Sequence, residues 1–194
     1  NIQLAELYSR KNENRKAIEY YEKVLVGNPL DSLRGLVYPK LGSEYLKFND
    51  FDKAAKYLIE GLDINRKYDN KTGILSALNN LGKLNLQTNR LVLAEQQLYE
   101  AGALAKSINN KPELLRYYKS MIVLDSTRGK FDRAFVWQRE YYGLKNSLQN
   151  AKNNRDSSSV RLDFNPDFEK ELANKNSIDP IASLSSQNPL AIDK

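Results

Sequence analysis

The chain has 194 residues, of which 41% are hydrophobic and 28% are charged, as is ordinary for a soluble globular protein. It contains no cysteine and no histidine, which excludes disulfides, zinc sites, thiol nucleophiles and catalytic arrangements that depend on an imidazole. The formal net charge of +6 divides into +7 for the first 150 residues and −1 for the rest, so one expectation is an acidic partner and the other is a lysine-rich surface that only aids solubility.

Four alanines along the chain mark the starts of four similar helices, at Ala17, Ala54, Ala94 and Ala134. Five residues before these alanines stand small or turn-forming residues: Asn12, Asn49, Asn89 and Gly129. A polar turn that leads into a helix explains these turn residues. An alanine in the helix lets a second helix approach closely. The spacing therefore predicts a repeated helical hairpin.

The residues around each alanine also recur. Twelve positions earlier the chain has Ala5, Gly42, Gly82 and Ile122, and four positions later it has Tyr21, Leu58, Leu98 and Gln138. Three of the latter four are large and apolar, on the face that a partner helix covers. Each unit is thus predicted to be a helix A, a tight turn and a helix B. We expect an all-α fold, a right-handed α-solenoid of about four helical hairpins, with units at residues 1–29, 33–67, 72–109 and 112–150.

One proline falls inside an expected helix. Pro39 lies in helix A of the second unit, where it removes a backbone donor and crowds the preceding turn. Either the helix is kinked there, or it begins near Tyr38 after a separate turn. The helical spacing of Leu33, Leu36 and Val37 favours the kink.

The composition changes after about residue 150. Residues 151–163 are predicted to be a linker or a helix end, and residues 164–194 a short helix followed by an extended tail. The tail is rich in Ser, Asn and Pro and is expected to be disordered alone. We hypothesise that Phe164, Phe168 and Leu172 dock the tail on the exposed end of the fourth unit.

The repeat resembles the tetratricopeptide repeat over about residues 1–150. The residues that match in the first unit are Leu4-Ala5, Tyr8, Ala17, Tyr21, Val24 and Pro29, and those in the second are Leu41-Gly42, Tyr45, Ala54 and Leu58. The third unit keeps Leu81-Gly82, Ala94, Leu98 and Ala101 but has Asn85 at the usual aromatic position. The fourth departs further, with Asp125, Gln138 and Tyr141 at sites that are normally apolar or small. Such a degenerate last unit is typical of a capping repeat.

The spacing of about 40 residues is longer than the usual tetratricopeptide period. In this the chain is similar to the repeats of bacterial peptide-sensing regulators and of the sensor regions of repeat-containing histidine kinases. That resemblance implies a role as the sensor part of a bacterial signalling protein.

The stacked hairpins are expected to place the A helices on a concave surface. The residues that face this groove are predicted to be Lys40, Ser43, Lys47, Asn79, Asn80, Lys83, Arg116 and Lys119. Five of them are cations and none is a carboxylate. Because lysine, arginine and asparagine form charge-assisted hydrogen bonds with carboxylates, the groove is expected to bind an acidic peptide or a free C-terminus. The alternative is a generic solvated face.

Some members of the family hold a terminal acidic residue in a carboxylate clamp. Asn80 occupies a clamp-like asparagine position here, and Arg116 and Lys119 lie one repeat later. The lysine and asparagine of the preceding repeat are replaced by Pro39 and Ser43, which puts a complete clamp in doubt. Nucleic acid is not expected, because phosphate binding needs a denser set of cations and the tyrosines mostly fall at packing positions.

The predicted function is therefore a non-enzymatic scaffold that binds a protein or peptide, without cofactor or metal. The alternative is a structural subunit of a larger envelope assembly, anchored through its C-terminal tail. An enzyme would need a pocket with paired carboxylates, and Glu95 and Glu100 are interpreted as solvated helix residues. No apolar run reaches the roughly 18 residues of a membrane-spanning helix. The chain opens on Asn1, which suggests a processed or excised segment, and a bacterial periplasm or envelope is favoured over the cytoplasm.

Overall fold

The computed structural model describes residues 1–27 and 29–156. Helices occupy most of this part of the chain, and strands are absent from it. The helices are α1 (Ile2–Arg10), α2 (Asn14–Leu25), α3 (Asp31–Lys47), α4 (Phe51–Lys67), α5 (Lys71–Gln87), α6 (Leu91–Ser107), α7 (Lys111–Thr127) and α8 (Phe131–Asp156). None of these described helices is both long and apolar enough to cross a membrane.

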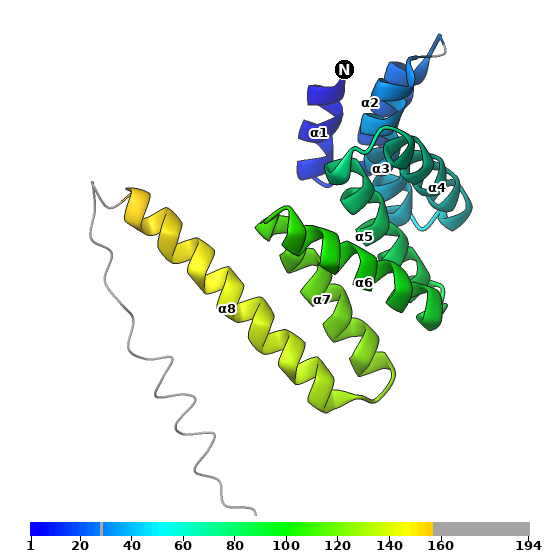
Figure 1. The fold of residues 1–194 in the computed structure, drawn as a ribbon. Helices are drawn as coiled ribbons and strands as arrows, with labels where there is room; N and C mark the ends of the chain where they lie inside the picture. The colour runs from blue at the N-terminus through cyan, green and yellow to red at the C-terminus, as the bar shows by residue number, and fades with distance from the viewer. Residues whose placement is uncertain (28, 157–194) are drawn as a thin grey trace, which may run out of the picture. The chain divides into compact units, whose positions relative to one another are not determined.

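The helices form successive pairs that stack in a row (Figure 1). Helix α1 packs on α2, α3 on α4 and α5 on α6, and α7 meets α8 through the Tyr117 and Trp137 rings. The first helices of neighbouring pairs also touch, because α5 contacts both α3 and α7. Stacking of this kind makes residues 1–150 an α-solenoid, as the repeat predicted.

The C-terminal predictions fall mostly beyond the described residues. Helix α8 continues past the predicted end of the fourth unit at residue 150 and reaches Asp156. The predicted short helix and tail, with Phe164, Phe168 and Leu172, lie outside the part of the chain that the structure describes.

The turn residue within each helical pair has a left-handed backbone. The φ angles are +59° at Asn12, +61° at Asn49, +56° at Asn89 and +69° at Gly129. Glycine and asparagine adopt this conformation more readily than other residues, which is the physical reason for their recurrence. The chain then enters the second helix, where the alanine five residues later is buried in every pair.

Small residues at helix crossings explain the tight stacking. A Cβ atom on Gly42 would lie 2.6 Å from Leu58, and one on Gly82 would lie 2.5 Å from Leu98. Leu58 and Leu98 are fully buried, so they have no room to give way. Gly102 similarly leaves space for the ring of Tyr117 in the following pair, at 2.7 Å. The glycines thus set the distance between helices.

Helix α3 is continuous through Pro39, so a helix start near Tyr38 is wrong. A proline at this position leaves the carbonyl of Gly35 without its backbone donor. The side chain of Asn65 on α4 donates to that carbonyl at 2.8 Å and to the carbonyl of Gly61 at 2.7 Å. Asn65 is 2% exposed. Its amide therefore repairs the hydrogen-bond ladder of the neighbouring helix.

A contact between residues twelve apart changes character along the solenoid. Tyr8 stacks on Tyr20 with ring centroids 5.3 Å apart, and Tyr45 stacks on Tyr57 at 5.6 Å. In the third pair the same two positions hold a hydrogen bond, from Asn85 Nδ2 to Gln97 Oε1 at 2.7 Å. In the fourth pair Trp137 Nε1 donates to Asp125 Oδ2 at 2.8 Å. Where Asn85 and Asp125 replace the first tyrosine of the stack, Gln97 and Trp137 replace the second and form a hydrogen bond with them.

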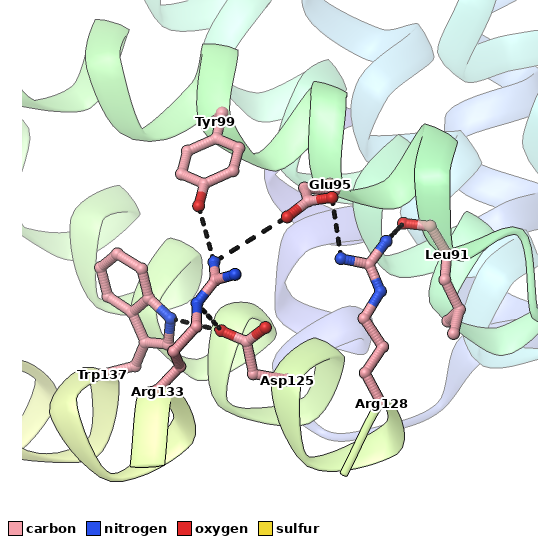
Figure 2. A network of polar contacts seen from close by, with 7 residues as sticks. All are labelled: Leu91, Glu95, Tyr99, Asp125, Arg128, Arg133 and Trp137. Carbon is pink, nitrogen blue, oxygen red and sulfur yellow. Dashed lines mark hydrogen bonds and ion pairs between the residues drawn. The ribbon is translucent and has the colours of Figure 1, made fainter. Parts of the chain in front are cut away.

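A polar network joins the third and fourth pairs (Figure 2). Arg133 on α8 contacts Asp125 at 3.3 Å and donates to the Tyr99 hydroxyl at 2.9 Å. Arg128 donates to Glu95 Oε2 at 2.8 Å and to the carbonyl of Leu91 at 3.0 Å. The side chain of Glu95 is only 27% exposed, so its interpretation as a solvated helix residue is wrong. It helps to fix the last pair on the solenoid.

Candidate functional site

A groove of about 770 Å³ runs across the first helices of the four pairs, α1, α3, α5 and α7. The eight residues predicted from the sequence all line this groove: Lys40, Ser43, Lys47, Asn79, Asn80, Lys83, Arg116 and Lys119. The structure therefore brings them together on one surface. Three carboxylates that were not predicted lie beside them, those of Glu6, Glu44 and Glu113.

At the α1–α3 end of the groove, the lysines are held by carboxylates. Lys40 forms an ion pair with Glu6 across the two helices. Lys47 pairs with Glu44 at 2.7 Å, and the Ser9 hydroxyl donates to the same Glu44 oxygen at 2.6 Å. Glu44 is only 3% exposed, whereas Lys47 is exposed. These two lysines are thus partly neutralised within the protein.

At the α5–α7 end, Glu113 organises two of the predicted residues. Asn79 Nδ2 donates to Glu113 Oε2 at 2.7 Å, and Arg116 approaches Glu113 Oε1 at 3.4 Å. Asn79 is 4% exposed, so its amide is part of the groove wall. Arg116 is exposed and its ion pair is a surface contact, which a ligand can replace with little loss.

The amide nitrogen of Asn80, the clamp-like asparagine, points at the neighbouring helix α3. Asn80 Nδ2 is turned toward the carbonyl of Pro39 on α3, at 3.4 Å, and the residue is 8% exposed. Ser43 lines the groove on the same helix as Pro39 and is half-buried. The amide nitrogen of Asn80 is therefore directed at α3.

Among the cations that line the groove, Arg10, Lys83 and Lys119 have no carboxylate partner in the part of the chain that the structure describes, and the two lysines lie together at the α5–α7 end. Lys83 on α5 and Lys119 on α7 line the groove, and neither has an ion pair or a side-chain hydrogen bond there. Desolvation by the groove walls lowers the pKa of Lys83, and the nearby Lys47, Lys119 and Arg116 lower it further. The charged form of Lys83 is therefore disfavoured in the free protein. An anion bound beside Lys83 would offset this electrostatic cost.

The three carboxylates were not predicted, because the positions predicted to face the groove were all in the second to fourth units and hold only cations, amides and a hydroxyl. Glu44 lies on the face between Ser43 and Tyr45, and Glu6 lies in the first unit, for which no groove residue was predicted. A signal was available for Glu6, because it is the repeat equivalent of Ser43: each lies eleven residues before the alanine of its unit.

Two matches to family models fall in the first half of the chain. The tetratricopeptide repeat model matches residues 2–33, which contain α1 and α2, and a second tetratricopeptide repeat model matches residues 37–68, which contain most of α3 and all of α4. These are the two pairs that keep a tyrosine stack at the positions twelve apart. Repeats of this family generally mediate interactions between proteins.

Solved structures share the fold. The crystal structure of BtubC (BKLC) from P. vanneervenii superposes with a TM-score of 0.64 at 18% sequence identity, over all of this chain and 69% of that chain. At that identity the likeness concerns the fold alone. No curated protein matched the sequence. The two repeat matches and the recurring helical pairs identify the chain as a tetratricopeptide-repeat protein.

Proposed function

We propose that this protein is a non-enzymatic scaffold that binds a protein or peptide in the groove of α1, α3, α5 and α7. The observation that supports the proposal is that Lys83 and Lys119 line a groove of about 770 Å³ and have no carboxylate partner among the residues that the structure describes. A groove of that size on stacked helices fits an extended segment of a partner better than a small metabolite.

The charge of the groove favours an acidic ligand. Its lining contains six cations, Arg10 among them, against three carboxylates. An anionic group on the ligand gains charge-assisted hydrogen bonds from Lys83 and Lys119 without having to displace an internal partner. The source of the carboxylate is an acidic side chain or a free C-terminus, and both remain within the proposal.

Peptide selection tests the proposal. Decapeptides selected from a random library against the full chain are labelled, and their affinities for Lys119→Glu and for Lys106→Glu are measured by fluorescence anisotropy. Lys106 is exposed on α6, outside the groove, so the control makes the same change in net charge. We expect about tenfold weaker binding for Lys119→Glu alone. An equal effect of both variants would show that binding depends on net charge and not on the groove.

A sensor role in a bacterial signalling protein and a structural role anchored through residues 164–194 remain predictions of the sequence. The two roles differ in lifetime and salt response. A sensor is expected to bind its peptide weakly and in a salt-sensitive way, and an anchored subunit is expected to copurify in one stoichiometric, salt-resistant complex. Affinity capture at low and high salt, followed by mass spectrometry, separates the two.

A further inference from the structure

One side of α8 carries large aromatic side chains that the described part of the chain leaves exposed. Phe131, Phe135 and Tyr142 are 69%, 68% and 49% exposed. They are spaced by four and seven residues, so they lie on one side of the helix, which we call the aromatic face. Trp137 lies on the opposite side and points toward Asp125 on α7 (Figure 2). Aromatic residues that gather on an exposed surface mark a site of interaction with another molecule.

The same side of an earlier helix binds the next helical pair. In α6, Glu95 accepts from Arg128 of the following pair at 2.8 Å, and the repeat equivalent of Glu95 in α8 is Phe135. The aromatic face therefore takes the position at which the solenoid contacts its next neighbour. A phenyl ring in place of the carboxylate removes the ion pair that fastens one pair to the next. The surface suits an apolar partner better than another repeat of the same kind.

Two opposite charges flank the aromatic face. Asp132 is exposed and has no ion pair or side-chain hydrogen bond among the described residues. Arg139 is also exposed, and its ion pair with the adjacent Glu140, at 3.7 Å, is a surface contact that contributes little. Asp132 and Arg139 lie seven residues apart, so they are on the same edge of the aromatic face, one on each side of Phe135 along the helix.

Two copies of this surface complement each other when α8 packs antiparallel on the α8 of a second copy. A two-fold axis beside Phe135 brings that ring against its own counterpart and brings Phe131 against Tyr142 of the second copy. Residues on the same edge of two antiparallel helices meet, so Asp132 then lies next to Arg139 of the second copy. The three contacts agree in register to roughly 3 Å along the helix axis, which is less than one helical turn.

We propose that the protein forms a two-fold symmetric dimer through the aromatic face of α8. The partner is a second copy because the rings and the two flanking charges complement themselves. The three rings expose about 350 Å² per copy, roughly half of what each partner buries in a specific interface. The flanking side chains of α8 supply the rest, so we expect a weak dimer with a dissociation constant on the order of 10 μM. None of these residues lines the groove, so the inference is independent of the proposed function.

Analytical ultracentrifugation of the full chain tests the dimer. Between about 1 and 200 μM, the average mass is expected to rise from the 22.2 kDa of one chain toward twice that value. Phe135→Ser is expected to weaken the dimer by about tenfold or more. Val92→Ser on α6, at a position that is 66% exposed, is the matched control and is expected to leave the dimer unchanged. Both replaced side chains are exposed, and circular dichroism confirms that both variants are folded.

Mixing two charge variants tests the antiparallel register. In a dimer of Asp132→Arg two arginines meet at each end, and in a dimer of Arg139→Asp two aspartates meet. Each variant alone is therefore expected to associate about tenfold more weakly than the wild type. In an equimolar mixture every arginine meets an aspartate, so the two variants are expected to form a heterodimer with the wild-type affinity. A fluorescent label on one variant detects the heterodimer.

Three results would overturn the inference. The first is a wild-type chain that stays monomeric over the whole concentration range, which is also the result if another part of the chain or a different protein covers the aromatic face. The second is a dimer that Phe135→Ser leaves intact, because the interface would then lie elsewhere. The third is a mixture of the charge variants that associates no better than either variant alone. None of these measurements involves a peptide, so the proposed function is tested separately.

Discussion

The side-chain amide of Asn65 donates a hydrogen bond of 2.8 Å to the carbonyl of Gly35, the group that Pro39 leaves without a backbone donor. Its oxygen in turn accepts from Asn70 at 2.7 Å, the residue that caps α5. One buried side chain on α4 thus contacts both α3, where Pro39 removes one backbone donor, and the N-cap of α5. These helices position most of the groove, so the integrity of the site depends on this contact.

Replacing Asn65 with alanine is expected to destabilise the protein strongly. The change removes all three hydrogen bonds of the side chain and leaves the Gly35 carbonyl buried without a donor, which together cost about 2–4 kcal/mol. Urea denaturation followed by circular dichroism measures the effect. Asn146→Ala on α8 is the matched control, because Asn146 is exposed and its loss should change stability by less than about 0.5 kcal/mol.

The same mutation in a Pro39→Ala background isolates the cause. Alanine at position 39 restores a backbone N–H that can donate to Gly35, so Asn65→Ala is expected to be less destabilising there than in the wild type, by about 1 kcal/mol. An identical cost in both backgrounds would show that Asn65 does not act by replacing the donor that proline lacks.

The left-handed turn residues have a distinct substitution pattern. At Asn89, where φ is +56°, alanine is expected to lower the stability by about 1 kcal/mol and glycine to leave it unchanged or raise it slightly. Thermal unfolding of Asn89→Ala and Asn89→Gly measures the difference. Equal unfolding temperatures for the two variants would contradict a left-handed backbone at this turn.

The fourth pair depends on the indole nitrogen of Trp137. Trp137→Phe keeps the ring contacts with Tyr117 and Tyr118 but removes the donor to Asp125, which is fully buried. We expect a loss of about 2 kcal/mol in the free energy of unfolding. Phe135→Leu on the same helix, at a position that is 68% exposed, should change it by less than about 0.5 kcal/mol. A neutral Trp137→Phe would mean that Arg133 alone satisfies the carboxylate.

Alkaline pH is expected to unfold the protein through its buried tyrosines. Desolvation raises the pKa of Tyr21, Tyr45 and Tyr117 above the ordinary value near 10. Above about pH 10 these phenols ionise in the unfolded chain but stay neutral in the folded one, so stability is full below that pH and falls as pH rises. Tyr117→Phe should lose stability less steeply between about pH 10 and 11 than the wild type; parallel curves would contradict the assignment.

Lys83 should destabilise the free protein. Its lowered pKa means that the charged form is disfavoured on folding, so the penalty is present below the folded pKa and disappears as pH rises through that value toward 10.5. Lys83→Met is expected to unfold about 1–2 °C higher than the wild type at pH 7, with a smaller difference at high pH, while peptide affinity falls. A Lys83→Met protein that is less stable at pH 7 would show that the ammonium has a stabilising partner.

Much of the fold could be predicted from the sequence because its signals are local and recur. Each turn residue, such as Asn49 or Asn89, and the alanine five positions later mark one helical pair. Because this pattern occurs four times, it fixes which residues of each helix are equivalent. The repair of α3 by Asn65 could not be predicted in this way. Asn65 is the repeat equivalent of Ala105, so its amide has a role only because Pro39 leaves the carbonyl of Gly35, thirty residues before Asn65, without a backbone donor.

The candidate site was predicted as a set of residues but not as a pattern of charges. Helical register indicates which side chains share the concave face, and it placed Lys83 and Lys119 there. It does not indicate which charges pair between neighbouring helices, as Lys40 does with Glu6. Because those pairings partly neutralise Lys40 and Lys47, the cationic strip of the sequence prediction became a groove whose two unpaired lysines, among the described residues, lie at the α5–α7 end.

Hydrogen exchange of the full chain with and without a selected peptide tests the central claim most directly. Mass spectrometry resolves exchange in α3, α5 and α7 separately from exchange in α4 and α6. Binding in the groove predicts slower exchange in α3, α5 and α7, with the protection lost in Lys83→Glu and kept in Lys106→Glu. Protection confined to α4 and α6, or equal in all three proteins, would contradict the claim that the concave groove is the binding site.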